Sequence, residues 1–263
     1  MEVCHYEERS LPDYRLCIHR GFATIQYANL DYYKAEAMHN LWERALDLVF
    51  PPRCAGCGAR GSLLCPACMA AIPSIQPPTC PQCGRRTTRS DICPVCRAYP
   101  NALDGMVAAT EFGKPVRECI HALKYEGQRR YADILAEMAR PALTRLPTPE
   151  AIVPVPLFSR REMGRGFNQS VLIAHHLAGR ALLVVPGWLA RTRDTPPQVG
   201  QNREARHANV AGAFSCPDPA AVRGQRILLL DDVATTGATL DACARALRAA
   251  GVASVHALVV AKA

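Results

Sequence analysis

The chain has 263 residues, of which 49% are hydrophobic and 21% are charged, so it is long enough for one α/β domain and a smaller module. Its formal net charge of +8 favours anionic partners such as pyrophosphate or nucleic acid. No apolar run approaches the roughly 20 residues that span a bilayer, and the N-terminus lacks the pattern of a secretory signal. We therefore expect a cytoplasmic protein without a membrane span.

The N-terminal part of the chain has little hydrophobic periodicity. Residues 1–40 are polar and aromatic, and we expect them to form a disordered leader. The apolar residues between Leu41 and Phe50 are spaced as in a short amphipathic helix, which Pro51 would end. Because this pattern begins just after Met38, Met38 is a candidate start of the native protein.

Cysteines concentrate in the next segment. Eight of the thirteen cysteines form four Cys-x-x-Cys pairs within residues 54–96. Each pair places two thiolates close enough to share one tetrahedral ion, and a second pair completes a closed four-cysteine site. Residues 41–100 are therefore predicted to hold a short helix and a double zinc ribbon with two structural Zn²⁺ ions. The predicted ligands are Cys54, Cys57, Cys65, Cys68, Cys80, Cys83, Cys93 and Cys96.

The sequence leaves open which pairs share an ion. Sequential pairing joins the first pair to the second and the third to the fourth through short loops, whereas crossed pairing leaves longer loops. We favour sequential pairing because shorter loops close at lower entropic cost. Gly58 and Gly84 follow their pairs, and a positive φ there would let the chain turn back. Iron in place of zinc is the alternative metal.

Strand-like and helix-like segments alternate from about residue 101 to the C-terminus. This alternation predicts an α/β domain over residues 101–263, with a parallel sheet that binds ligands at the carboxyl ends of its strands. The predicted strands are Gly105–Phe112, Ala151–Val155, Leu182–Val185, Arg226–Leu230 and Val255–Val260. The predicted helices are Val116–Tyr125, Tyr131–Leu146 with a break or kink at Pro141, Asn168–Gly179 and Thr239–Ala250.

The most informative segment is residues 227–239, Ile-Leu-Leu-Leu-Asp-Asp-Val-Ala-Thr-Thr-Gly-Ala-Thr. Its apolar run predicts a buried strand that delivers Asp231 and Asp232 to an exposed carboxyl end. The turn that follows opens onto a helix N-terminus, where backbone N–H groups and the helix dipole favour an anion. Two carboxylates suit a vicinal diol or a magnesium ion, so the segment predicts a sugar-phosphate site. The predicted phosphate loop consists of Thr235, Thr236, Gly237, Ala238 and Thr239.

A second anion site is predicted at residues 154–169, Pro-Val-Pro-Leu-Phe-Ser-Arg-Arg-Glu-Met-Gly-Arg-Gly-Phe-Asn-Gln. A strand ends there in a proline turn, and a basic loop with glycines leads to a helix start. Arginine forks match phosphate oxygens, so we expect this loop to bind pyrophosphate. A solvated basic loop is the alternative. The candidate ligands are Arg160, Arg161, Arg165, Asn168 and Gln169.

The pattern Asp-Asp-x-x-Thr-Thr-Gly-x-Thr of residues 231–239 resembles the motif by which type I phosphoribosyltransferases bind 5-phosphoribosyl-1-pyrophosphate (PRPP). The resemblance implies that Asp231 and Asp232 act as catalytic residues that hold the ribose hydroxyls of Mg²⁺-bound PRPP. It also implies that the phosphate loop wraps the 5-phosphate. The 6-oxopurine enzymes carry an Asp at the position of Thr235, which argues against hypoxanthine or guanine as acceptor. Lys124 would lie near the pyrophosphate, or else be a solvated lysine at a helix end.

The cysteine pairs and three further motifs together resemble the ComF/GntX family. These motifs are Pro-x-Pro at 154–156, Arg-Gly-Phe-Asn-Gln at 165–169, and the acidic motif at 231–239. The resemblance covers about residues 41–263. It implies a type I phosphoribosyltransferase-like parallel sheet with an N-terminal double zinc ribbon, and for some members a role in DNA uptake during natural transformation. It does not imply an acceptor.

Two functions therefore stay open. In an enzyme, departure of pyrophosphate would leave an oxocarbenium-like ribose, so positioning and charge stabilisation would do most of the catalysis. Residues 192–209, with Gln198, Arg203 and Arg206, would then form a lid that excludes water. The alternative is an adaptor without turnover, which senses PRPP or binds single-stranded DNA or a DNA-uptake protein. The lack of an obvious general base weakens the enzyme hypothesis.

Overall fold

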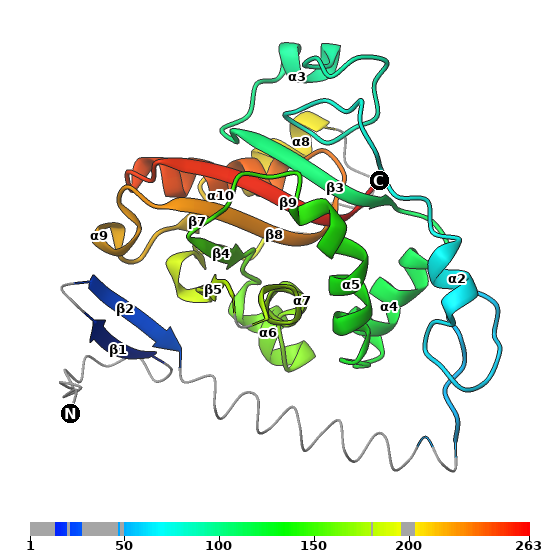
Figure 1. Cartoon of the computed structure of the whole chain (residues 1–263). Helices are drawn as coiled ribbons and strands as arrows, with labels where there is room; N and C mark the ends of the chain where they lie inside the picture. The colour runs from blue at the N-terminus through cyan, green and yellow to red at the C-terminus, as the bar shows by residue number, and fades with distance from the viewer. Residues whose placement is uncertain (1–13, 20–21, 28–46, 48–49, 180, 196–202) are drawn as a thin grey trace. The chain divides into compact units, whose positions relative to one another are not determined.

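The computed structural model describes residues 14–19, 22–27, 47, 50–179, 181–195 and 203–263 (Figure 1). The chain divides into two compact units. One comprises residues 1–53 and 60–62, and the other comprises residues 54–59 and 63–263. The second unit thus contains all eight paired cysteines and the α/β domain. Most of the predicted helix at 41–50, and Gln198, lie outside the described residues.

The first unit contains a two-stranded antiparallel ribbon. Strand β1 (Tyr14–His19) pairs with strand β2 (Phe22–Tyr27) along their whole length. We did not predict these strands, because polar residues interrupt any regular alternation in this part of the sequence. The assignment of residues 1–40 as a leader, and of Met38 as the native start, stays a prediction.

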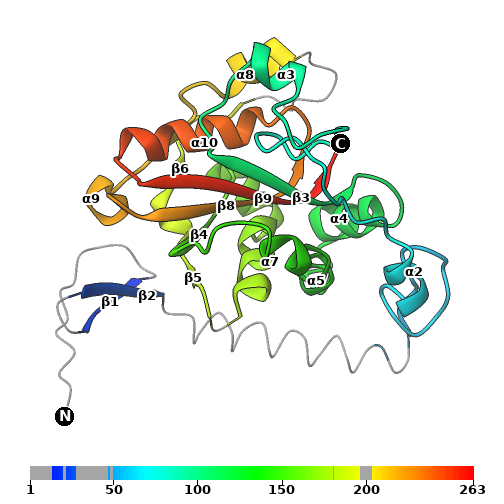
Figure 2. The ribbon, with the colours of Figure 1, turned by 45° about the horizontal axis from the view of Figure 1, so that its top comes forward.

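The second unit is built on a five-stranded sheet in the order β3-β9-β8-β4-β5, and every neighbouring pair is parallel (Figure 2). The run Ile227–Leu230 is completely buried, because both faces of the parallel sheet are covered. The predicted parallel α/β architecture is confirmed. The strands are β3 (Gly105–Glu111), β4 (Ala151–Pro154), β5 (Leu183–Val184), β8 (Arg226–Ala234) and β9 (Ser254–Lys262).

Helices cover both faces of this sheet. Helices α5 (Tyr131–Leu143) and α7 (Gln169–Ala178) pack together on one face, and α10 (Ala238–Ala249) lies on the other with α8 (Arg203–Val210) against it (Figure 2). Among the described residues, no helix has both the length and the apolarity needed to cross a membrane. The remaining elements of the domain are α4 (Val116–Tyr125), α6 (Ser159–Arg165), η1 (Pro186–Trp188), β6 (Ala190–Arg191), β7 (Phe214–Ser215) and α9 (Pro219–Val222).

Several predicted elements differ from the observed ones in their bounds, and three of the differences have a clear physical cause. Helix α5 continues through Pro141 to Leu143, because this proline lies near the end of the helix. Strand β8 does not end at Leu230 but runs on to Ala234, since it keeps pairing with β9. The predicted basic loop is largely helix α6, which ends at Gly166 with a φ of +79°. Its arginines and glycines masked a short helix with a left-handed glycine cap.

Candidate functional site

The paired cysteines form two clusters, in the order that sequential pairing predicts. The sulfur atoms of each cluster lie within 4.8 Å of one another. The Sγ atoms of Cys57 and Cys65 are 3.8 Å apart, and so are those of Cys83 and Cys93. A tetrahedral ion with zinc–sulfur bonds of about 2.3 Å requires sulfur separations of about 3.8 Å. The donor set and its spacing therefore fit a structural Zn²⁺ in each cluster.

The local geometry of the two clusters is the same. In the first, the N–H of Gly58 donates to the carbonyl of Cys54 at 2.8 Å, and in the second the N–H of Gly84 donates to Cys80 at 2.9 Å. Both glycines have a positive φ, +77° and +65°, as predicted. After the third cysteine of each cluster a short helix begins at a proline: α2 (Pro66–Ala70) and α3 (Pro94–Ala98). We name residues 54–72 the first ribbon and residues 78–99 the second ribbon.

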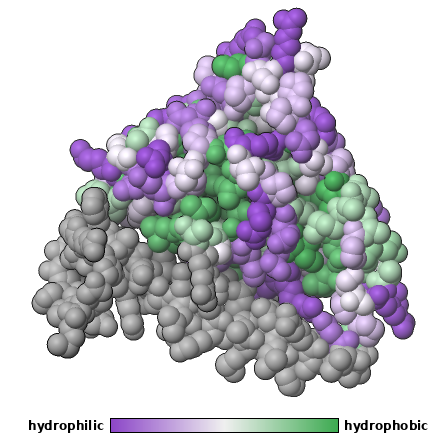
Figure 3. Space-filling view, in the orientation of Figure 1, coloured by the Kyte–Doolittle hydropathy of each residue, from purple (hydrophilic) through white to green (hydrophobic). Residues whose placement is uncertain are grey.

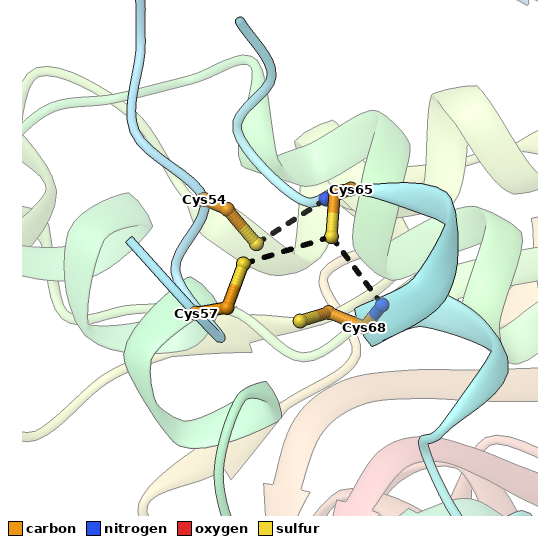
Figure 4. A group of neighbouring side chains, drawn as sticks. All are labelled: Cys54, Cys57, Cys65 and Cys68. Carbon is orange, nitrogen blue, oxygen red and sulfur yellow. Dashed lines mark hydrogen bonds between the residues drawn. The ribbon is translucent and has the colours of Figure 1, made fainter. Parts of the chain in front are cut away.

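Backbone N–H groups donate to sulfur atoms in both clusters. The N–H of Cys65 donates to Sγ of Cys54 at 3.3 Å (Figure 4). In the second cluster the N–H of Cys93 donates to Sγ of Cys80, also at 3.3 Å. Burial would raise the pKa of Cys54, but backbone N–H donors outweigh burial and lower its pKa to about 6. The same balance lowers the pKa of Cys93 to about 7. In each cluster one thiol thus ionises more readily than usual, while the pKa of its neighbour Cys68 or Cys96 is raised, so zinc would have to bind the latter as a thiolate.

The acidic pair of residues 231–232 lies in the interior of the protein, not at an exposed strand end as predicted. Asp231 and Asp232 are 9% and 3% exposed, because β8 continues past them and α4 brings Lys124 over them. The ammonium group of Lys124 forms an ion pair with Oδ2 of Asp232. The Oδ1 atom of Asp231 accepts from the hydroxyl of Ser170 at 3.1 Å and from the N–H of Asp232 at 2.9 Å.

The two carboxyl groups have opposite protonation tendencies. Burial raises the pKa of Asp231 well above its usual value, and the neighbouring charge of Asp232 raises it further. Burial also acts to raise the pKa of Asp232, but the ammonium of Lys124 outweighs burial, so the net shift is downward. Burial works against the charge of Lys124, yet its partner Asp232 gives a net rise in its pKa. Asp232 and Lys124 are therefore charged, and Asp231 is the carboxyl that retains a proton most readily.

The predicted phosphate loop connects β8 to α10. Gly237, the N-cap residue of α10, has a φ of +83° and carries no side chain to cap the helix. The hydroxyl of Thr236 accepts from the N–H of Ala238 at 3.3 Å. Two cations reach the first residue of the loop: Arg206 donates to the hydroxyl of Thr235 at 2.7 Å, and Lys262 donates to its carbonyl. The loop thus combines a helix N-terminus with positive charge, which favours an anion.

A cavity of about 500 Å³ joins the loop to one of the acids. Asp231, Thr235 and Gly237 line it at the carboxyl ends of the parallel strands. Helix α4 contributes further lining residues, among them His121 and Lys124. The side chain of His121 also contacts Oε1 of Glu126 at 3.2 Å. The further lining residues are Phe112, Arg117, Ile120, Tyr125, Arg206, Val233, Ala234, Ala238, Thr239, Leu240 and Ala263.

None of the five candidate residues of the second anion site lines this cavity, although Arg165 lies against Tyr125, which does. Arg165 donates to Gln169 and lies 5.7 Å from the ring centroid of Tyr125. Arg161 donates to the carbonyl of Thr195 and lies 3.5 Å from a carboxylate oxygen of Asp194, so its guanidinium contacts the segment after β6. Arg160 is exposed on α6.

Asn168 and Gln169 are buried and support the local structure. Asn168 caps α7 by accepting from the N–H of Ser170 at 2.9 Å, and it donates to the carbonyl of Val155 at 3.0 Å. The burial of these two polar side chains is explained by these bonds and by the bond from Arg165. Their predicted contact with a ligand stays a prediction.

Sequence reasoning missed several residues of the site. Ser170 follows the cap of α7, and its contact with Asp231 spans 61 positions. Lys262 could have been found, because the carboxyl ends of parallel strands meet at one edge and this lysine ends the last strand. His121 lies one helical turn before Tyr125, but no sequence pattern distinguishes it from a solvated residue.

Comparison with known proteins matches both parts of the chain. Residues 45–97 match the double zinc ribbon domain, and residues 168–263 match the phosphoribosyl transferase domain. The chain is 33% identical to the DNA utilization protein YhgH of Escherichia coli K12 over 194 residues, which are 67% of this chain and 81% of that protein. It is 32% identical to competence protein F of Haemophilus influenzae over 221 residues, which are 78% of this chain and 94% of that protein.

A third relative is less similar in sequence. The competence protein ComFC of Bacillus subtilis is 24% identical over 192 residues, which are 70% of this chain and 77% of that protein. The two matched domains follow one another in the order that the sequence motifs indicated. The cysteine clusters and the parallel sheet agree with those two domains. The chain therefore belongs to the ComF/GntX family, in which a double zinc ribbon precedes a phosphoribosyltransferase domain.

Proposed function

We propose that this protein binds PRPP together with Mg²⁺ and acts as a phosphoribosyltransferase. The observation that carries the proposal is the cavity that places Asp231 next to the phosphate loop, at the carboxyl ends of the parallel strands. In this proposal the phosphate loop binds the 5-phosphate, and Asp231 and Asp232 hold the ribose hydroxyls and the metal. Arg165 and Lys124 lie toward the pyrophosphate.

The ion pair between Lys124 and Asp232 would have to open when PRPP binds. Asp232 can contact the ribose hydroxyls only if the ammonium group shifts toward an incoming anion, and pyrophosphate supplies that charge. Burial also favours the protonated form of Asp231, so this carboxyl would have to ionise in order to hold Mg²⁺. Mg²⁺ and pyrophosphate are thus expected to bind together, because pyrophosphate would pair with the ammonium of Lys124 and Mg²⁺ would neutralise the two carboxylates.

A catalytic role for the site is supported by His121. Transfer of the ribosyl group to a nitrogen nucleophile requires a group that accepts a proton from the acceptor. His121 lines the cavity and contacts Glu126, an arrangement that can orient an imidazole ring. We assign His121 as the candidate base, which the sequence alone did not suggest.

The proposal is tested by calorimetric titration of Mg²⁺–PRPP into the wild type and Asp232→Asn. We expect the variant to lose at least tenfold in affinity, because it removes a charge that contacts the metal-bound ribose. Asp218→Asn is the matched control, since Asp218 caps α9 and asparagine caps equally well. Both variants should retain two zinc ions per chain. Unchanged PRPP affinity in a folded Asp232→Asn protein would rule out the site assignment.

The second test separates an enzyme from an adaptor without turnover. Pyrophosphate release from PRPP is measured with a panel of free bases and amines as acceptors. Release that depends on one acceptor supports the transferase, whereas tight PRPP binding without release for any acceptor supports a PRPP sensor. A role in DNA uptake or use is proposed from the names of the relatives, competence protein F and DNA utilization protein YhgH. Salt-dependent affinity for single-stranded DNA in the full chain tests that role.

A further inference from the structure

The second ribbon contacts the elements that carry the phosphate loop. The hydroxyl of Tyr99, directly after α3, donates to Oε1 of Glu204 on α8 at 2.8 Å. Two residues further along α8, Arg206 donates to the hydroxyl of Thr235 at 2.7 Å and lines the cavity. One short helix therefore joins the end of the second ribbon to the first residue of the phosphate loop.

A second set of contacts follows the same course. The N–H of Ala102, just beyond the second ribbon, donates to Oδ1 of Asp241 on α10 at 2.8 Å. The other carboxylate oxygen of Asp241 lies 3.7 Å from Nδ1 of His207 on α8 and accepts from Arg245 at 3.1 Å. Asp241 is 6% exposed, so this carboxylate is held inside the protein by its partners. The chain after α3 thus fixes both α8 and the first turns of α10.

We propose that the second ribbon is a structural part of the phosphate site, and that Tyr99 positions α8 so that Arg206 binds the 5-phosphate of PRPP. This inference rests on the proposed binding of PRPP. A guanidinium carries five N–H donors in a planar fork, which suits phosphate oxygens. Arg206 already donates to the first residue of the loop that is expected to hold the phosphate. Tyr99 touches no ligand and acts through Glu204, which makes it a positioning residue.

The position of Arg206 predicts which ligands bind less tightly when the contact between Tyr99 and α8 is lost. Ribose 5-phosphate carries only the phosphate that the loop and Arg206 would bind. Mg²⁺–pyrophosphate carries the charges expected near Arg165, Lys124 and the acidic pair. Substitution of Tyr99 should therefore lower the affinity for ribose 5-phosphate and leave the affinity for Mg²⁺–pyrophosphate unchanged. A general loss of stability would lower both affinities.

The test is calorimetric titration of both ligands into the full-length, zinc-loaded protein. We expect Arg206→Gln to lower the affinity for ribose 5-phosphate by about tenfold or more. Tyr99→Phe should lower it by about threefold to tenfold, because the variant loses one hydrogen bond to a charged group. Both variants should leave Mg²⁺–pyrophosphate affinity within about twofold of the wild type. Tyr131→Phe is the matched control, because it removes a tyrosine hydroxyl that contacts the first ribbon instead. It should change neither affinity.

A conservative variant provides the rescue. Glu204→Gln keeps an oxygen that accepts from Tyr99, so its loss of ribose 5-phosphate affinity should be smaller than that of Glu204→Ala. Wild-type affinity for ribose 5-phosphate in Tyr99→Phe or in Arg206→Gln would overturn the inference and leave PRPP binding intact. Equal losses for both ligands would also overturn it, since they indicate a structural effect. A wild-type protein that binds neither ligand nor PRPP would instead refute the proposed function itself.

Discussion

The two ribbons share one local geometry, but they meet the α/β domain in different ways. The first ribbon contacts the helical layer, where the hydroxyl of Tyr131 donates to the carbonyl of Leu63 at 3.3 Å. The second lies along β3 through backbone bonds, among them one from the N–H of Met106 to the carbonyl of Pro81 at 2.8 Å. In the view of Figure 3, hydrophobic residues gather around α2, whereas the segment that carries α3 is largely hydrophilic.

Burial of the metal ligands follows the same difference. Cys57 in the first cluster is exposed, while Cys80 in the second is fully buried. Gly84 of the second ribbon also lies against the backbone of β3, so close that a Cβ atom there would be 3.1 Å from the amide nitrogen of Ala108. A repeated metal-binding unit is thus a surface module in one copy, whereas the other copy is bonded to the edge of the sheet.

The largest effect on stability is expected from single substitutions of zinc ligands, one in the second ribbon and one in the first. Cys80→Ser should cost about 3 kcal/mol or more and lower the thermal midpoint by on the order of 10 °C, because zinc binding supplies folding energy and this ligand is buried against the domain. Cys57→Ser should lower the midpoint by less than half as much. Both variants should fall from two zinc ions per chain to one, as measured by metal analysis. Equal shifts in the midpoint would contradict the difference between the ribbons.

A smaller effect is expected from paired glycine substitutions. Gly58→Ala should cost about 1–2 kcal/mol of unfolding free energy, because alanine disfavours a positive φ. Gly84→Ala should cost roughly 3 kcal/mol, since its Cβ must also displace the backbone of β3. At Gly58 no atom lies within 4 Å of such a Cβ, so this variant is the control. Denaturant unfolding of the zinc-loaded proteins measures both, and a Gly84→Ala cost no larger than that of Gly58→Ala would show that the contact with β3 is loose.

The smallest effect concerns the surface ion pair of the second ribbon. Arg86 contacts Glu111 at 2.9 Å, with side chains that are 49% and 56% exposed. Exposed pairs contribute about 0–1 kcal/mol, so Arg86→Ala should lower the unfolding free energy by less than about 1 kcal/mol. Raising the salt concentration should remove the part of that difference that comes from the ion pair, but not the part from the bond that Arg86 donates to the carbonyl of Ser74 at 2.9 Å. A cost of 2 kcal/mol or more would mean that side chains, rather than backbone bonds, attach this ribbon to the sheet.

Much of this architecture could be predicted from local patterns. The Cys-x-x-Cys pairs and the glycines after them determine the metal clusters, since each cluster needs only residues that are near in sequence. Helix α4 has the predicted bounds, Val116–Tyr125, because its apolar spacing is regular. The parallel sheet followed from the alternation of strands and helices.

The parts that could not be predicted depend on contacts between distant segments. The burial of Asp232 is set by Lys124, which lies more than one hundred positions away on another element. The bond between Tyr99 and Glu204 joins residues 105 positions apart, and the sequence pattern of neither segment predicts it. Helix α6 was hidden because its composition is that of a basic loop. Motifs made of neighbouring residues could therefore be predicted from this sequence, whereas contacts between residues that are far apart in the chain could not.

The position of the second ribbon along β3 also bears on the solubility of the protein. The N–H of Ile75, in the segment that leads into this ribbon, donates to the carbonyl of Ala109, and Ser74 pairs with Thr110. Together with the bond from Met106 to Pro81 of the second ribbon, these bonds occupy the outer edge of β3, the first strand of the sheet. Open strand edges recruit strands from other molecules. Zinc starvation should therefore expose a sheet edge to self-association, so metal supply would govern aggregation as well as folding.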